Sequence, residues 1–105
     1  MNKRASERIP SSLVVNFFQD DSVCYGIATN ISEKGMCIKS GNSFPRESLI
    51  KIQIPLKEGH LEVPVKVTRV EKAEGFYDTM GVELLKPSKQ YLQILASFKT
   101  SPESA

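Results

Sequence analysis

Apolar and polar residues alternate along two stretches in the middle of the chain, residues 50–56 and 61–67. Isoleucine occupies positions 50, 52 and 54 of the first stretch, and leucine or valine occupies positions 61, 63, 65 and 67 of the second. Because side chains two residues apart leave the same face of an extended strand, each stretch has one aliphatic face and one more polar face. The pattern predicts two amphipathic β-strands joined by a turn at residues 57–60.

Four further stretches have the composition of short strands, and residues that favour turns separate them. These stretches are residues 13–18, 23–31, 36–39 and 76–85. Within residues 23–31, bulky residues alternate with small ones, so this strand has one bulky face and one small face. Six short strands at regular spacing predict a mainly all-β fold, a small antiparallel barrel or sandwich.

Two irregularities are expected in the strand that begins at Leu61. Pro64 has no N–H to donate to a neighbouring strand, so the strand is predicted to be an edge there or to contain a bulge. After Val67, Val70 breaks the odd-numbered phase of the aliphatic residues. A bulge near Thr68 and Arg69 accounts for this change of phase.

The hydrophobic period changes from two to that of a helix near the C-terminus. Ser88 is the expected N-cap of this helix. The apolar residues at helical spacing are Tyr91, Ile94, Leu95 and Phe98. We expect them to pack a single C-terminal helix over one opening of the barrel rather than to form a ligand site. The barrel and helix are assigned to residues 10–100, and residues 101–105 to a tail.

The first nine residues are rich in charge and show no apolar period, so they are predicted to form a flexible N-terminal arm. Pro10 favours an extended conformation for the preceding residue and limits any helix in the arm. Lys3, Arg4 and Arg8 gather positive charge at this end of the chain. The arm is therefore a candidate for binding an anion.

The composition is that of one soluble domain, with 105 residues of which 40% are hydrophobic and 25% charged. No run approaches the roughly 18 apolar residues of a membrane helix, and no apolar signal region follows the polar N-terminus. A cytoplasmic location is expected. A net charge of +2 is too small for a general nucleic-acid-binding protein, so any preference for anions must be local.

The sequence contains no motif for catalysis or for a metal site. It lacks a nucleophile elbow, a phosphate-binding loop and a His-containing metal motif, and His60 has no potential co-ligand near it in the sequence. If residues 32–35 close a hairpin, Cys24 and Cys37 lie roughly 20 Å apart. This is beyond the reach of a disulfide, so both are expected to be reduced thiols. The protein is not predicted to be an enzyme.

The segment from Asn30 to Gly35 is predicted to form a polar turn between two strands. Asn30 and Ser32 are two residues apart and are expected to project from the same face, and Gly35 is expected to adopt a positive φ that reverses the chain. A guanidinium group suits both bidentate contacts with phosphate and stacking on a base. Arg4 and Arg8, four residues apart, can therefore hold one anion from two sides.

These two motifs together resemble the paired motif of PilZ domains, bacterial receptors for the second messenger cyclic di-GMP. The motifs are Arg4-x-x-x-Arg8 and Asn30-x-Ser32-x-x-Gly35. The similarity extends from residue 3 to about residue 85, and residues 66–70 and 80–84 look like the last two strands of the family. Each motif is short and weak alone, whereas their order, spacing and flanking strands together are fairly specific. The family often has Asp where this chain has Asn30, which keeps the acceptor but not the charge.

The resemblance implies a six-stranded antiparallel β-barrel with a C-terminal α-helix, which binds cyclic di-GMP and needs no cofactor. It implies a signal passed to an unidentified effector protein, with outputs such as motility, biofilm formation or exopolysaccharide production. The arginine pair would neutralise the phosphodiesters and contact guanine, Asn30 and Ser32 would meet a guanine edge, and Gly35 would allow close approach. Lys3 and Arg69 are weaker candidates for the same surface.

Two alternatives remain at this stage. One is a small β-barrel that binds single-stranded nucleic acid, which would use aromatic stacking and a basic groove. The chain has no Trp to serve such a surface. The other is a PilZ-like interaction module that has lost its ligand, and the retained motif residues argue against it.

Overall fold

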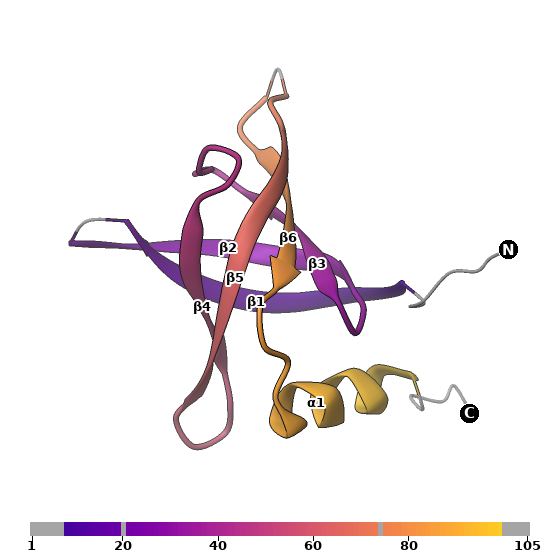
Figure 1. Ribbon diagram of the computed structural model, residues 1–105. Helices are drawn as coiled ribbons and strands as arrows, with labels where there is room; N and C mark the ends of the chain where they lie inside the picture. Colours follow the sequence, from indigo (N-terminus) through magenta and orange to yellow (C-terminus); the bar gives the residue numbers. More distant parts are fainter. Residues whose placement is uncertain (1–7, 20, 74, 100–105) are drawn as a thin grey trace, which may run out of the picture.

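Six antiparallel strands close into a barrel in the computed structural model, which describes residues 8–19, 21–73 and 75–99 (Figure 1). The strands are β1 (Ile9–Gln19), β2 (Ser22–Ile31), β3 (Gly35–Ser40), β4 (Leu49–Pro55), β5 (His60–Glu71) and β6 (Asp78–Leu84), and one helix, α1 (Lys89–Lys99), follows. Around the barrel the strand order is β1-β2-β3-β6-β5-β4. The predicted six-stranded barrel with a C-terminal helix is confirmed.

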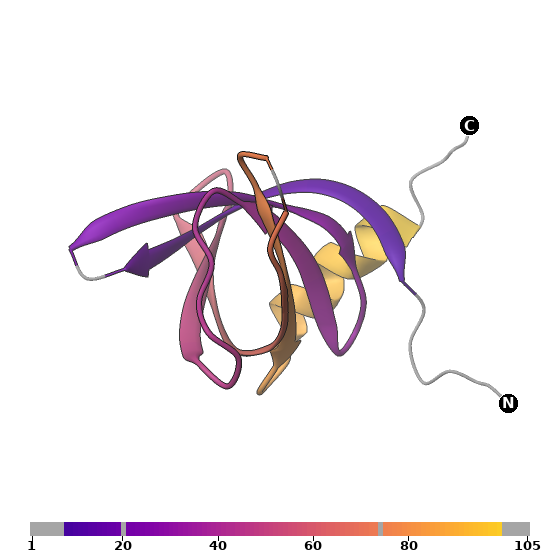
Figure 2. The same ribbon diagram turned by 90° about the horizontal axis from the view of Figure 1, so that it is seen from above.

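The barrel closes through a short contact between β1 and β4, which consists of two residue pairs, Asn16 with Gln53 and Phe17 with Ile52. By contrast, β1 and β2 pair along almost their whole length, from Ile9 with Ile31 to residues 19 and 22 at the tip. The β1–β2 hairpin consequently extends past β4 on one side of the barrel, as two perpendicular views show (Figures 1 and 2).

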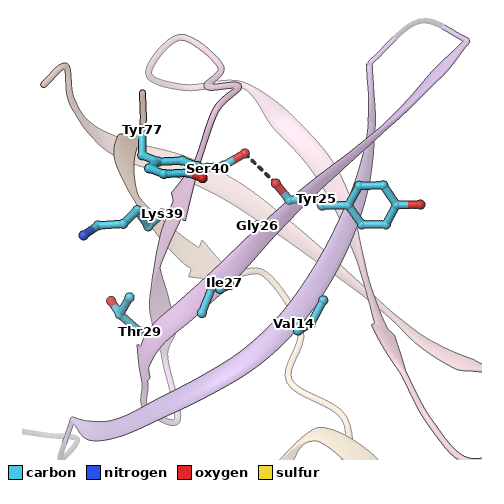
Figure 3. A pocket seen from close by; sticks show the side chains of 8 residues that line it. All are labelled: Val14, Tyr25, Gly26, Ile27, Thr29, Lys39, Ser40 and Tyr77. Carbon is cyan, nitrogen blue, oxygen red and sulfur yellow. Dashed lines mark hydrogen bonds between the residues drawn. The ribbon is translucent and has the colours of Figure 1, made fainter. Parts of the chain in front are cut away.

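The small face of β2 points into the barrel and the bulky face points outward. Cys24, Gly26 and Ala28 are buried, whereas Tyr25 and Ile27 are 65% and 45% exposed and lie on the outer surface (Figure 3). The small side chains let β3 approach closely. A Cβ added at Gly26 would lie 2.8 Å from a methyl group of the buried Ile38.

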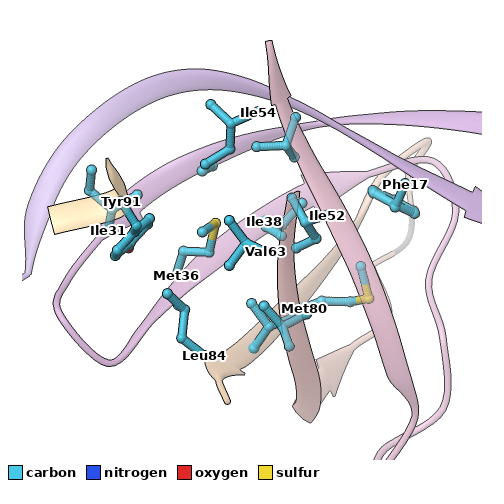
Figure 4. Packing of buried hydrophobic residues seen from close by; sticks show 14 of the residues in the cluster. Phe17, Ile31, Met36, Ile38, Ile52, Ile54, Val63, Met80, Leu84 and Tyr91 are labelled. Carbon is cyan, nitrogen blue, oxygen red and sulfur yellow. The ribbon is translucent and has the colours of Figure 1, made fainter. Parts of the chain in front are cut away.

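The core contains side chains from every strand and from the helix (Figure 4). The alternation predicted for β4 and β5 is present, because Ile52, Ile54, Val63, Val65 and Val67 are all buried. Each buried aliphatic side chain of this kind stabilises the fold by about 1.5–3 kcal/mol relative to exposure. The barrel interior is therefore a packed core where the structure describes it.

Among the described residues, bulges shift the register in three places, and all three lie beside residues of the candidate site. One lies in β5 between Val67 and Arg69, as the change of phase predicted. A second lies in β2 between Ala28 and Asn30, and it returns Ile31 to the core while Asn30 stays half-exposed. Pro64 pairs with Lys51 of β4, but the pairing of β5 with β6 begins only at Val65. On the β6 side, β5 is therefore an edge at Pro64, as predicted.

Helix α1 lies across one end of the barrel, against β1 and β5 (Figures 1 and 2). Its N-cap is Ser88, whose Oγ accepts a hydrogen bond of 3.1 Å from the backbone N–H of Tyr91. The predicted packing face is confirmed, since Tyr91 and Leu95 are buried and Ile94 and Phe98 pack on the core. No helix in the described part of the chain is long and apolar enough to cross a membrane.

Two strands start more than one residue from the predicted position. β1 begins at Ile9 instead of Leu13, because Ile9 pairs with Ile31 and is only 9% exposed, so the residue that we had assigned to the arm belongs to the barrel. β6 begins at Asp78, and Phe76, which we had placed in the strand, is 91% exposed. Arg8 of the predicted arm is described and precedes β1, whereas residues 1–7 of the arm and the tail lie outside the described residues.

Candidate functional site

The turn between β2 and β3 is organised by the hydroxyl of Ser32. The backbone N–H groups of Lys34 and Gly35 donate to Ser32 Oγ at 3.3 and 3.2 Å, and Ser32 N–H donates to the carbonyl of Gly35 at 2.8 Å. A serine hydroxyl that accepts from the N–H groups two and three residues later is a common way to stabilise a turn. The four-residue turn is thus held by its own hydrogen bonds.

Ser32 differs from its expected orientation. We expected Asn30 and Ser32 to project together, but β2 ends at Ile31 and Ser32 is only 4% exposed, with its hydroxyl directed into the turn. The rule that side chains two apart share a face applies within a strand, and here the strand has already ended. The exposed polar groups of the turn are those of Glu33 and Lys34.

Gly35 is required for close approach rather than for chain reversal. The prediction of a positive φ at Gly35 is wrong, because Gly59 is the glycine with positive φ among the described residues. A Cβ at Gly35 would lie 2.2 Å from the carbonyl oxygen of Val82 in β6, far inside van der Waals contact. The backbone of β6 thus occupies the space that a side chain at position 35 would need.

Arg8 and Asn30, predicted from separate motifs, are in contact. The pairing of Ile9 with Ile31 and of Pro10 with Asn30 brings the start of β1 beside the end of β2. From there the Arg8 guanidinium donates a hydrogen bond of 2.5 Å from Nη1 to Asn30 Oδ1 at the exposed surface. Arg4 and Lys3, the other predicted cations of the arm, lie outside the described residues.

A row of cross-strand neighbours connects Asn30 to Arg69. Asn30 pairs with Cys37, Cys37 with Gly81, and Gly81 with Arg69. Three strand spacings separate the ends of this row, a distance of roughly 14 Å. We call Asn30, Cys37, Gly81 and Arg69 the outer row; its ends are polar and its centre consists of a half-buried thiol and a glycine.

The Arg69 side chain lies over Gly81. A Cβ at Gly81 would be 3.6 Å from both Nε and Cζ of Arg69, so the absence of a side chain there makes room for the guanidinium. Arg69 Nε is also 3.6 Å from Glu71 Oε2, and both side chains are more than half exposed. An ion pair with this exposure is weak, which leaves the guanidinium available to another anion.

Tyr91 connects helix α1 to the turn between β2 and β3. Its hydroxyl donates a hydrogen bond of 2.6 Å to the carbonyl oxygen of Ser32, and the side chain is fully buried. Burial raises the pKa of Tyr91 to about 12, because the phenolate would lose its hydration. From the helical spacing, Tyr91 is predicted only to pack on the barrel. The signal that this prediction missed is that a buried Tyr usually needs a partner for its hydroxyl.

The described residues contain no group of three or more His, Cys, Asp or Glu side chains that could hold a metal ion. Cys24 and Cys37 are thiols, the first buried and the second half-buried, as expected. The arrangement at the turn can bind an anion or a planar base. It offers a guanidinium, an amide and a shallow strip of small residues.

Comparisons with known proteins point to one family. The family model described as "PilZ domain" matches residues 2–100 of the chain. None of the curated proteins matches the sequence.

Solved structures with the same fold include three that are described as motility or PilZ proteins. The inhibitor of motility MotI/DgrA from Bacillus subtilis aligns with a TM-score of 0.74 at 19% identity, over 98% of this chain and 52% of that one. The PilZ domain of YcgR from Escherichia coli, solved with c-di-GMP, aligns with a TM-score of 0.74 at 13% identity, over 97% of this chain and 92% of that one.

The third is the PilZ domain of CeSA from a cellulose-synthesizing bacterium, with a TM-score of 0.62 at 18% identity, over 93% of this chain and 99% of that one. The chain thus spans about half of the MotI/DgrA chain and almost the whole of the two isolated domains.

Proposed function

Because the chain belongs to the PilZ domain family, we propose that it is a receptor for cyclic di-GMP and binds this nucleotide between its N-terminal arginines and the outer row. The observation that carries the proposal is the contact of Arg8 with Asn30, which unites two motifs 22 residues apart at one exposed place. The pairing of Pro10 with Asn30 brings the two motifs together, and their polar groups meet at the exposed surface, where one ligand can reach both.

Arg8 and Arg4 supply the positive charge for the two phosphodiesters. A guanidinium fork matches both a phosphate and the O6 and N7 acceptors of guanine, so the same side chain can neutralise charge and select the base. In the free protein Arg8 is held on Asn30 by a hydrogen bond. This contact reduces the conformational freedom that Arg8 loses when a ligand binds.

Asn30 and the outer row provide the surface on which the nucleotide lies. The Asn30 amide has both a donor and an acceptor for a guanine edge. Cys37 has a small side chain, and the Arg69 side chain, which covers Gly81, can stack on a base or pair with the second phosphate. Lys3 adds a further cation from the arm.

In this proposal Ser32 and Gly35 act by shaping the turn. Ser32 holds the N–H groups of Lys34 and Gly35, and Gly35 lets β3 begin against β6. Together they set the direction in which β2 delivers Asn30 to the surface. A direct contact of the Ser32 hydroxyl with guanine requires that the turn open.

The signal would pass to an effector protein that reads the nucleotide together with the barrel surface. Motility, biofilm formation and exopolysaccharide production are the outputs that the family resemblance suggests. A receptor of this kind performs no chemistry on its ligand.

Calorimetric titration tests the proposal, with cyclic di-AMP and a short single-stranded oligonucleotide as controls. We expect saturable heat with cyclic di-GMP and much weaker binding of cyclic di-AMP, because adenine lacks the O6 acceptor while the phosphodiester ring is the same. Ligand at 100 times its dissociation constant stabilises the folded state by about 2.7 kcal/mol. The absence of both heat and a melting shift would reject the receptor, and binding of the oligonucleotide alone would favour the nucleic-acid alternative.

A further inference from the structure

A second exposed feature lies on the outer side of the barrel, next to the outer row, because Thr29, which lines it, adjoins Asn30. A groove of about 460 Å³ lies over β2 and β3, with Val14 of β1 and Tyr77, which precedes β6, at its sides. We call it the outer groove; its walls are Val14, Tyr25, Ile27, Thr29, Lys39 and Tyr77, and Gly26 and Ser40 form its floor (Figure 3). The turn hydrogen bonds and the contact of Arg8 with Asn30 use none of these side chains.

The face that carries the outer groove exposes more apolar surface than its fold requires. Tyr25, Tyr77 and Phe18 are 65%, 56% and 47% exposed. With about 200 Å² for a whole aromatic side chain, these three residues alone expose roughly 340 Å². Val14, Val23 and Ile27, each nearly half exposed, enlarge the same face. The largest apolar patch of this extent on a small protein is often functional.

The face contains both a projection and a hollow that suits it. Tyr25 stands at the edge of the groove with its ring directed away from it, whereas Tyr77 and Lys39 lie on the opposite wall (Figure 3). A tyrosine ring needs apolar walls and its hydroxyl needs a polar partner. The groove offers Ile27 and Val14 for the ring and the Lys39 ammonium as a donor to the hydroxyl oxygen.

We propose that a second copy of this chain occupies the outer groove, with Tyr25 of each copy inserted into the groove of the other. Such an interface is isologous, because the same patch serves both partners about a two-fold axis. Among the described residues that line the groove, Lys39 is the charged one, so two copies meet with little repulsion. An acidic or basic partner would find almost no complementary charge there.

The expected dimer is weak. Two such faces, together with a polar rim, bury on the order of 1,200 Å², the lower limit for specific interfaces. The dimer should therefore form in the micromolar range and dissociate on dilution. Sedimentation velocity over a series of concentrations measures this directly on the full chain without ligand, so the outcome is independent of the proposed nucleotide site.

The test compares Tyr25→Thr with Leu49→Thr. Both remove a large exposed side chain from a strand, since Leu49 is 68% exposed on β4, but Leu49 lies outside the groove. We expect a concentration-dependent dimer for the wild type and for Leu49→Thr, and a dissociation constant about tenfold higher or more for Tyr25→Thr. Circular dichroism verifies that each variant is folded.

Filling the groove provides a second variant. Thr29→Arg leaves Tyr25 in place and should also weaken the dimer, because the long side chain occupies the hollow and adds positive charge beside Lys39. If the wild type remains monomeric at high micromolar concentration, the proposal is wrong, even if some other molecule binds this face. A dimer that Tyr25→Thr and Thr29→Arg leave unchanged would also overturn it.

Discussion

Individual residues of the candidate site divide into those that face a ligand and those that hold the turn. Arg8 and Asn30 meet at the exposed surface, whereas Ser32 and Gly35 are buried and bond or pack within the protein. The four positions belong to the two motifs, yet their substitution should have different consequences. The ligand-facing residues should affect affinity, and the turn residues should affect stability.

Arg8→Ala should weaken cyclic di-GMP binding by tenfold or more, because a charge-assisted contact is lost, and should leave the melting temperature of the free protein nearly unchanged. Arg46→Ala is the matched control, since Arg46 is an exposed arginine in the loop before β4. Calorimetry and thermal unfolding of both variants provide the comparison. Equal affinities of Arg8→Ala and Arg46→Ala for cyclic di-GMP would show that Arg8 does not contribute to binding.

Gly35→Ala should destabilise the protein by about 1–3 kcal/mol or more, because the added methyl group meets the backbone carbonyl of Val82 at 2.2 Å and the backbone cannot easily move. Urea unfolding measures the effect. The control is Gly75→Ala, where an added Cβ has nothing within 4 Å. Similar stabilities of the two variants would show that the β6 backbone moves to accommodate the added methyl group.

At the scale of elements, helix α1 and the β2–β3 turn form one unit through Tyr91. The hydroxyl of Tyr91 and the carbonyl of Ser32 are 59 residues apart in sequence and 2.6 Å apart in the fold. The Leu84 N–H also donates to the Lys34 carbonyl at 2.8 Å, so the turn is attached to β6 as well. The turn that delivers Asn30 is therefore fastened to two elements that lie late in the chain.

Tyr91→Phe should lower the free energy of unfolding by about 1–3 kcal/mol at neutral pH, because the Ser32 carbonyl is left buried without its hydrogen-bond partner. The difference from wild type should shrink as the pH rises from about 10 to about 12. In that range the unfolded Tyr91 has lost its proton while the folded one, with a pKa of about 12, retains it, so rising pH favours the unfolded wild type.

Chemical denaturation of the wild type and of Tyr91→Phe across this pH range measures their difference in free energy of unfolding. Subtracting one value from the other cancels the contributions of the titratable groups that both proteins contain. A difference that stays constant up to pH 12 would show that the Tyr91 hydroxyl titrates normally.

At the scale of the whole molecule, the barrel is a rigid support with a packed core and the proposed site lies on its outside. Cyclic di-GMP can therefore act without entering or rearranging the core. We propose that binding adds ordered contacts at residues 2–8 and makes a joint surface of arm, nucleotide and barrel, a switch of the order–disorder type.

Hydrogen exchange with and without cyclic di-GMP tests this mechanism. Amides of residues 2–8 and of the β2–β3 turn should gain protection on binding, and those of β4, on another part of the barrel, should change little. The β4 amides provide the internal control. If protection changes concentrate in β4 and β5, the signal passes through the core and the proposed mechanism is wrong.

Local patterns in the sequence determined the type of each element. The alternation in β4 and β5 predicted their buried faces, the change of phase after Val67 predicted the bulge, and the spacing from Tyr91 to Phe98 predicted the helix. The joint presence of the two motifs was enough to indicate the family. All of these signals depend on residues close together in sequence or on motif order.

Tertiary structure decided the features that depend on distant residues. The direction of the β2 faces follows from how closely β3 can pack, Ile9 joins β1 because it pairs with Ile31, and the need for glycine at position 35 comes from Val82. The hydrogen bond from the Tyr91 hydroxyl to the Ser32 carbonyl likewise joins residues that are distant in the sequence. Register and barrel closure create these contacts between separate elements, and a periodicity within one element carries no information about its neighbours.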